Sequence, residues 1–140
     1  MDIQVNWLAV VLATVSSMVV GTIWYARPVF GTAWIKLAKV DMKKNASSAV
    51  PILATLVVSF LTAFVLAHMS LLSYKHFGGS FLQDAVTTAF WAWLGFTAAR
   101  FITHDAFEGR PATLTVLNCA HELVTIMVMA VVIGYLPPAL

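Results

Sequence analysis

Four long apolar blocks dominate the sequence and restrict the fold more than any other feature. They run over Val5–Tyr25, Val50–Leu72, Phe81–Thr103 and Ala112–Leu136. Each has about the 20 residues that a helix needs to cross a hydrocarbon core about 30 Å thick. Of the 140 residues, 61% are hydrophobic and 10% are charged, so a water-soluble domain of this length could not hide its apolar surface. We predict an all-α integral membrane protein whose four transmembrane helices form one compact bundle over residues 1–140.

Positive charge is concentrated in two connecting segments. The segment after the first block and the region around the third loop together hold seven of the eight Lys and Arg residues, namely Arg27, Lys36, Lys39, Lys43, Lys44, Arg100 and Arg110. Cytoplasmic loops carry such an excess of positive charge. We therefore expect a cytoplasmic (inner) membrane, with both termini outside and the two basic loops in the cytoplasm.

The segment that follows the first block has the pattern of a membrane exit. Aromatic residues sit at its start, where an interfacial belt is expected, and a proline then stops the helix. Further on, aromatic and lysine residues recur on opposite faces, which predicts a short amphipathic helix at about residues 30–44 lying on anionic lipid. The expected interfacial anchors are Trp24, Tyr25, Arg27, Phe30 and Trp34.

Small residues recur at four-residue spacing in the first three blocks. Lipid gives helices no hydrophobic reason to associate, so close backbone approach through small side chains is the usual means of packing. Two interpretations stay open: packing within one bundle, or self-association as a homo-oligomer or with other membrane subunits. The candidate contact residues are Ala13, Ser17, Gly21, Ser59, Ala63, Ala92, Gly95 and Ala99.

Polar residues interrupt the fourth block. Glu122 lies ten residues into it, about 15 Å deep at 1.5 Å per residue. A carboxylate at that depth costs a few kcal/mol unless it is protonated or paired, and Arg100 could reach it. His121 would need another partner, such as Thr14 or Ser17. The stripe predicts either a proton, cation or polar-solute site or a structural hydrogen-bond network, formed by Thr115, Asn118, His121, Glu122 and Thr125.

A second polar cluster ends the third block. His104, Asp105 and Glu108 are weak candidates for metal ligands, because a short loop offers few of them; a solvated helix end that pairs with Arg100 or Arg110 is the other interpretation. Thr125 stands where a zinc-protease helix would carry its second histidine. We expect no metal, no cofactor and no nucleic-acid partner.

Aromatic and glycine motifs give the chain a family resemblance. One motif follows Asn6-Trp7-Leu8 and contains Gly21, Trp24-Tyr25, Pro28, Phe30-Gly31 and Trp34. A second comprises Trp93-Leu94-Gly95-Phe96, Phe107-Glu108-Gly109-Arg110-Pro111 and Asn118. The chain resembles the bacterial membrane family catalogued as domain of unknown function 1761. The resemblance implies a small four-helix membrane protein and supplies no reaction.

The sequence leaves three classes of function open. The first is a non-enzymatic protein that acts through helix–helix association, as a homo-oligomer or an accessory subunit. The second is a small oligomeric transporter or channel for a proton, cation or small polar solute, with its polar site around Glu122. The third is a membrane-embedded enzyme that uses His104, Asp105 and Glu108.

Overall fold

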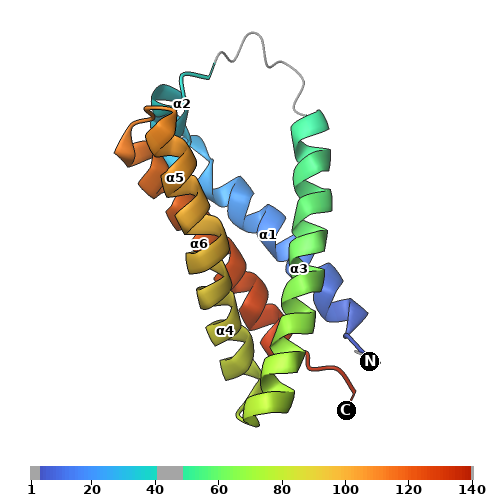
Figure 1. Cartoon of the computed structure of the whole chain (residues 1–140). Coiled ribbons are helices and arrows are strands. Elements are labelled where there is room, and N and C mark those ends of the chain that lie inside the picture. Colours follow the sequence, from blue (N-terminus) through green and yellow to red (C-terminus); the bar gives the residue numbers. More distant parts are fainter. Residues whose placement is uncertain (1–3, 41–48, 140) are drawn as a thin grey trace.

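A computed structural model describes residues 4–40 and 49–139, and all regular structure in these residues is helical (Figure 1). The elements follow one another along the chain as α1 (Trp7–Trp24), the π-helical turn η1 (Arg27–Gly31), α2 (Thr32–Leu37), α3 (Ala49–Phe77), α4 (Phe81–Ala92), the π-helical turn η2 (Trp93–Ala98), α5 (Ala99–Phe107) and α6 (Ala112–Tyr135).

Three of the four predicted spans are confirmed as helices long and apolar enough to cross a membrane, namely α1, α3 and α6. The remaining block is carried by α4, η2 and α5, which run without a break from Phe81 to Phe107. The π turn divides this segment, so no single helix in it has the length of the other three. The count of four spans therefore stays a prediction.

The predicted amphipathic helix at residues 30–44 is shorter than expected in the part that the structure describes. Its first residues belong to η1, and α2 ends at Leu37. Lys39 adopts a left-handed backbone with φ of 53°, which ends the helical path. Lys43 and Lys44, expected on its polar face, lie outside the described residues.

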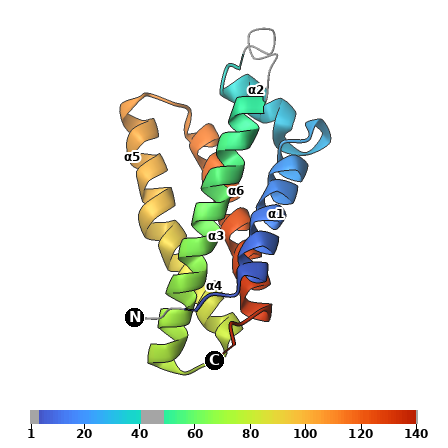
Figure 2. The same ribbon diagram turned by 90° about the vertical axis from the view of Figure 1, so that its right-hand side faces the viewer.

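Asn6 links the first helix, α1, to the end of the last helix, α6. Its Oδ1 caps α1 by accepting from the backbone N–H groups of Leu8 and Ala9, at 3.0 and 3.3 Å. Its Nδ2 donates to the carbonyl oxygens of Leu136 and Pro137, just past α6, at 3.2 and 3.4 Å. The start of α1 and the end of α6 therefore lie together, opposite α2 and the end of α5 (Figure 2).

A tightly packed core lies at this end of the molecule. It is built from small and aliphatic side chains of four helices, with α1 and α4 both packed on α6 and α3 packed on α1 and α4. A Cβ at Gly134 would lie 2.8 Å from the Cα of Leu82, so glycine lets α6 approach α4 closely. We call this the closed half; its fully buried residues include Ala9, Ala13, Ala63, Leu71, Ala85, Ala89, Met129 and Ala130.

Toward the other end the helices diverge, and we call this region the open half. In the described chain α3 contacts neither α5 nor α2. Every residue from 49 to 58, the first turns of α3, is exposed. Figure 2 shows α5 standing apart from the start of α3.

The predicted small-residue contacts divide between buried and exposed positions. Ala13, Ser17, Ser59 and Ala63 are buried between helices of the same chain, whereas Gly21 and Ala92 are half-buried. Gly95 and Ala99 are exposed, and nothing lies within 4 Å of a Cβ placed at Gly95. The small residues of α1 and α3 thus pack against other helices of the same chain, whereas Gly95 and Ala99 are not covered by the described part of the chain.

Candidate functional site

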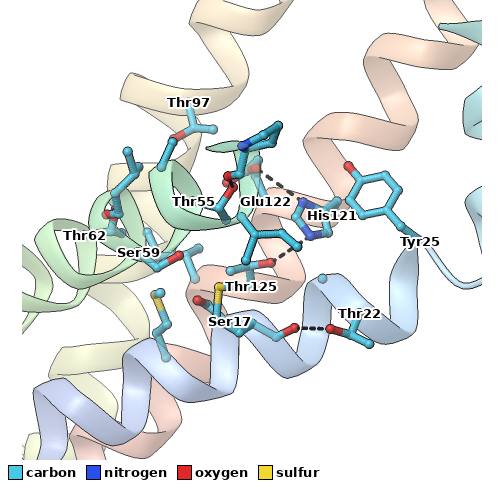
Figure 3. Close-up of a pocket in the computed structure, with 18 residues that line it drawn as sticks. Ser17, Thr22, Tyr25, Thr55, Ser59, Thr62, Thr97, His121, Glu122 and Thr125 are labelled. Carbon is cyan, nitrogen blue, oxygen red and sulfur yellow. Dashed lines mark hydrogen bonds and ion pairs between the residues drawn. The ribbon is translucent and has the colours of Figure 1, made fainter. Parts of the chain in front are cut away.

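A cavity of about 660 Å³ occupies the open half, between α1, α3 and α6. Tyr25, the residue after α1, and Thr97 of η2 also line it (Figure 3). Its lower wall is apolar and includes Met18, Ile126 and Met129, where the closed half begins. The rest of the lining is unusually polar for helices of this hydrophobicity.

Hydroxyl groups supply most of the polarity. Four of them donate to a backbone carbonyl earlier in their own helix: Ser17 to Thr14, Thr22 to Met18, Thr55 to Pro51 and Thr62 to Val58, at 2.8, 2.8, 2.8 and 2.9 Å. Helical Ser and Thr commonly bond in this way, which leaves the oxygen lone pairs free to accept. The hydroxyl-bearing Ser and Thr residues of the lining are Ser17, Thr22, Thr55, Ser59, Thr62, Thr97 and Thr125.

His121 connects a carboxylate with one of these hydroxyls. Its Nδ1 lies 3.3 Å from Oε1 of Glu122, and its Nε2 lies 3.4 Å from Oγ1 of Thr125 (Figure 3). The His121 side chain is 13% exposed and that of Glu122 is 41% exposed. The imidazole is therefore held inside the fold, while the carboxylate opens into the cavity.

The aromatic turn after α1 covers the imidazole. The ring centroids of Tyr25 and Trp24 lie 4.9 and 5.8 Å from that of His121. Trp34 packs edge-on against Tyr25 at 5.2 Å, and Phe30 lies 4.5 Å from Trp24. Residues expected to be interfacial anchors thus reach the polar site directly.

Two glycines lie at this contact, and the backbone at one of them, Gly31, leaves no room for a Cβ. A Cβ at Gly31 would collide with the carbonyl of Tyr25, in the turn that the Gly31 N–H closes on the Ala26 carbonyl at 3.0 Å. A Cβ at Gly21 would lie 3.7 Å from Nε2 of His121, so this position of α1 lies directly against the imidazole. Both glycines shape the contact between the aromatic turn and α6.

The comparison with known families accounts for these motifs. A family model described as "Protein of unknown function (DUF1761)" matches residues 8–134, nearly the whole chain. The chain belongs to the DUF1761 family. No curated protein and no solved structure matches it.

Another motif residue of this DUF1761 protein links two helices. Trp93, the first residue of η2, donates from its Nε1 to the backbone carbonyl of Cys119 in α6, at 3.0 Å. This bond holds the α4–α5 segment to α6 at the level where the open half begins. The cavity wall that carries Thr97 is fixed by the same contact.

Three predicted members of the polar stripe lie away from the cavity lining. Arg100 is exposed on α5 and does not pair with Glu122, which the structure pairs with His121 instead. Asn118 is half-buried but does not line the cavity. Thr115 donates to Oδ2 of Asp105 at 2.7 Å, toward the end of the molecule. The expected bonds from His121 to Thr14 or Ser17 are also absent from the described contacts, in which both hydroxyls donate to carbonyls of α1.

The predicted cluster forms the C-terminal end of α5, with His104 and Asp105 inside the helix and Glu108 as its C-cap. Asp105 is buried and accepts from Thr115, and its carboxylate lies 3.7 Å from Nε of Arg110. Arg110 also bonds to Glu108 at 2.6 Å. His104 is exposed. Among the described residues, no three His, Cys, Asp or Glu side chains are grouped so that they could hold a metal.

Thr55, Thr62 and Thr97 are site residues that the sequence analysis did not predict, whereas Ser59 was predicted only as a helix contact. Thr55, Ser59 and Thr62 follow one another at spacings of four and three, which places them on one helical face. That periodicity is the signal that could have found them. Thr97 has no comparable signal, because it lies within a π turn.

Proposed function

We propose that this protein is a four-span protein of a bacterial cytoplasmic membrane. The segment Phe81–Phe107 is long enough to serve as the fourth span beside α1, α3 and α6. In Figure 2, α2 and the end of α5 lie opposite the start of α1 and the end of α6. The basic residues Arg27, Lys36, Lys39 and Arg110 belong to or directly adjoin η1, α2 and the end of α5. By the positive-inside rule that basic end faces the cytoplasm and both termini face outward.

Its function in this proposal is the transport of a small polar solute. One observation carries the proposal: the cavity between the apolar helices α1, α3 and α6 is lined by His121, Glu122, Tyr25 and the hydroxyls of seven Ser and Thr residues. In lipid-spanning helices, ionisable residues are rare and mark substrate, ion or proton pathways. A cavity of this size suits a small organic molecule, and its few polar groups would fix the orientation of that molecule.

Movement of the solute across the membrane requires the helices to rearrange. Below the cavity lies the closed half, where Met129, Ala130 and Ile133 of α6 are buried against neighbouring helices. A second opening on that side would arise if α1 or α3 tilted relative to α6, in the rocking manner of alternating access. Four helices enclose little space, so we propose that two or more copies act together.

Flux in proteoliposomes tests the transport proposal. Candidate solutes are screened with the wild type, and the flux found is then measured with Glu122→Gln, which removes the carboxylate but keeps the shape of the side chain. We expect flux to fall by about tenfold or more. Glu108→Gln is the matched control, because Glu108 is an exposed carboxylate outside the cavity. Flux that survives Glu122→Gln unchanged would contradict the proposal.

A second candidate function is association with another membrane helix. Gly95 and Ala99 are exposed, and a Cβ at Gly95 would meet nothing within the described chain, so a close helix contact is available there. The mass of the protein in nanodiscs, compared between the wild type and Gly95→Leu, tests this candidate. A defined oligomer that the substitution dissociates supports it, and an unchanged mass rejects it.

We propose no enzymatic role. The order Thr125, His121 and Glu122 is that of hydroxyl, imidazole and carboxylate in hydrolytic triads. Such a site also needs hydrogen-bond donors for an oxyanion, and the backbone N–H groups around Thr125, in the middle of α6, are already used by the helix itself. A hydrolytic activity that Thr125→Val abolishes would overturn this part of the proposal.

A further inference from the structure

Several hydroxyl groups in the cavity lining can accept but not donate hydrogen bonds, which indicates the kind of solute that the cavity accepts. Ser17, Thr22, Thr55 and Thr62 each donate their proton to a carbonyl of their own helix. A hydroxyl that has given its only proton to the backbone can act toward a ligand only as an acceptor. Four of the seven Ser and Thr hydroxyls in the lining therefore present lone pairs and favour a ligand rich in N–H donors.

The charge of the cavity also favours a ligand with N–H donors, and in particular a cation. Glu122 is its carboxylate, and none of the described residues that line it is Lys or Arg. His121 approaches Oε1 of Glu122, and no described side chain donates to Oε2. A carboxylate in a low-dielectric site is stabilised by a cation, and charge-assisted hydrogen bonds are about twice as strong as neutral ones.

Size and apolar surface distinguish an organic cation from a metal ion. A volume of about 660 Å³ is far more than a bare ion fills, and no three metal-ligating side chains gather among the described residues. Met18, Ile126 and Met129 add apolar surface to the same lining, and Ile126 and Met129 follow Glu122 along one face of α6. The face of Tyr25 can add a cation–π contact.

We propose that the cavity binds an organic ammonium ion that carries N–H groups and an apolar body. The ammonium group bonds to Oε2 of Glu122 and to the hydroxyl oxygen of Thr55, which lies beside it (Figure 3), while the apolar body lies against Met18 and Met129. This inference rests on the proposed function and names its substrate class. Since α3 leaves α5 uncontacted beside the cavity, an amphiphilic amine dissolved in the membrane can enter from the side.

Calorimetric titration in phosphatidylcholine nanodiscs, with empty nanodiscs as the blank, tests the proposal. The probes are benzylamine, which is protonated at neutral pH, benzyltrimethylammonium, which has the charge without N–H groups, and benzyl alcohol, which has no charge. We expect benzylamine to bind about tenfold more tightly than either of the others. Equal affinity for benzyltrimethylammonium would refute the role of the hydroxyl acceptors, and absence of benzylamine binding would refute the proposal altogether.

Two sets of variants locate the binding. Glu122→Gln is expected to weaken benzylamine about tenfold and to leave benzyl alcohol unchanged. The variant Thr55→Val is expected to weaken benzylamine binding about fivefold, and it alters α3 outside the packed core. Thr103→Val is the matched control, because Thr103 also donates to its own helix, at 2.8 Å, but lies outside the cavity. Unchanged benzylamine binding in both cavity variants would overturn the assignment of the site.

The binding and flux experiments separate the two proposals. If benzylamine binds through Glu122 but no solute crosses proteoliposomes, the ligand class stands and the transport function is wrong. If flux depends on Glu122 for a solute that is not an amine, transport stands and the ligand class is wrong.

Discussion

The two halves of this molecule use the same helices for opposite purposes. Along α3, Ala63, Leu66 and Leu71 are buried in the closed half, whereas residues 49–58 in the open half are exposed. Along α6, the buried Met129, Ala130 and Ile133 precede the C-terminus, whereas His121 and Glu122 face the cavity. The comparison teaches that tight packing at one end fixes the helices well enough for them to diverge at the other.

The difference follows from what holds apolar helices together. In lipid the burial of apolar side chains gives little net free energy, so association depends on close van der Waals contact. The alanines of the closed half and Gly134 permit that close contact. The open half has fewer such contacts and keeps hydrogen-bonding groups instead.

The largest effect is expected from truncation of a leucine in the closed half. Leu71 is 1% exposed, so Leu71→Ala leaves a cavity in packed surroundings and should lower the free energy of unfolding by about 2–4 kcal/mol. Leu56, on the same helix, is 41% exposed, and Leu56→Ala should cost less than about 1 kcal/mol. Unfolding in detergent micelles, followed by tryptophan fluorescence, measures both. Equal losses would mean that the two halves of α3 are equally packed.

A smaller effect is expected where a methyl group is added. Gly134→Ala places a Cβ against the backbone of Leu82, and the resulting overpacking should cost about 1–3 kcal/mol. Gly95→Ala meets open space in the described structure and should leave stability unchanged or raise it by up to about 1 kcal/mol. The same unfolding measurement compares them. A Gly95→Ala variant as unstable as Gly134→Ala would show that the exposed small residues Gly95 and Ala99 pack against another helix in the assembled protein.

The smallest effect is expected from neutralising the carboxylate of the open half. Glu122 keeps 41% of its side chain exposed and bonds only to the neighbouring His121 among the described residues. Glu122→Gln should therefore change the free energy of unfolding by less than about 1 kcal/mol, even though it removes the proposed ligand site. A loss above about 2 kcal/mol would instead assign the polar chain to the stability of the fold.

Helix positions were predictable from the sequence because the length of an apolar block determines them. The fourth block was expected to begin at Ala112, where α6 begins, and α1 begins two residues after the expected Val5. The membrane-crossing character of α1, α3 and α6 follows from composition alone. These features depend on local sequence.

The partners of the polar residues were not predictable in the same way. Arg100 was expected to reach Glu122, but η2 precedes it, and a π turn changes the angular position of every residue that follows. His121 and Glu122 point about 100° apart on an ideal helix, yet their side chains are long enough to meet at 3.3 Å. The cavity itself depends on where α3 and α5 separate, which residue periodicity does not encode.

The double role of Asn6 has a practical consequence for engineering. Because this one side chain bonds to both the start of α1 and the end of α6, a short linker could join these two places without crossing the molecule. A circular permutant reopened at the Gly78–Gly79 turn would keep every helix intact. Two copies could likewise be fused head to tail on one side of the membrane, giving a tandem in which one cavity at a time can be altered.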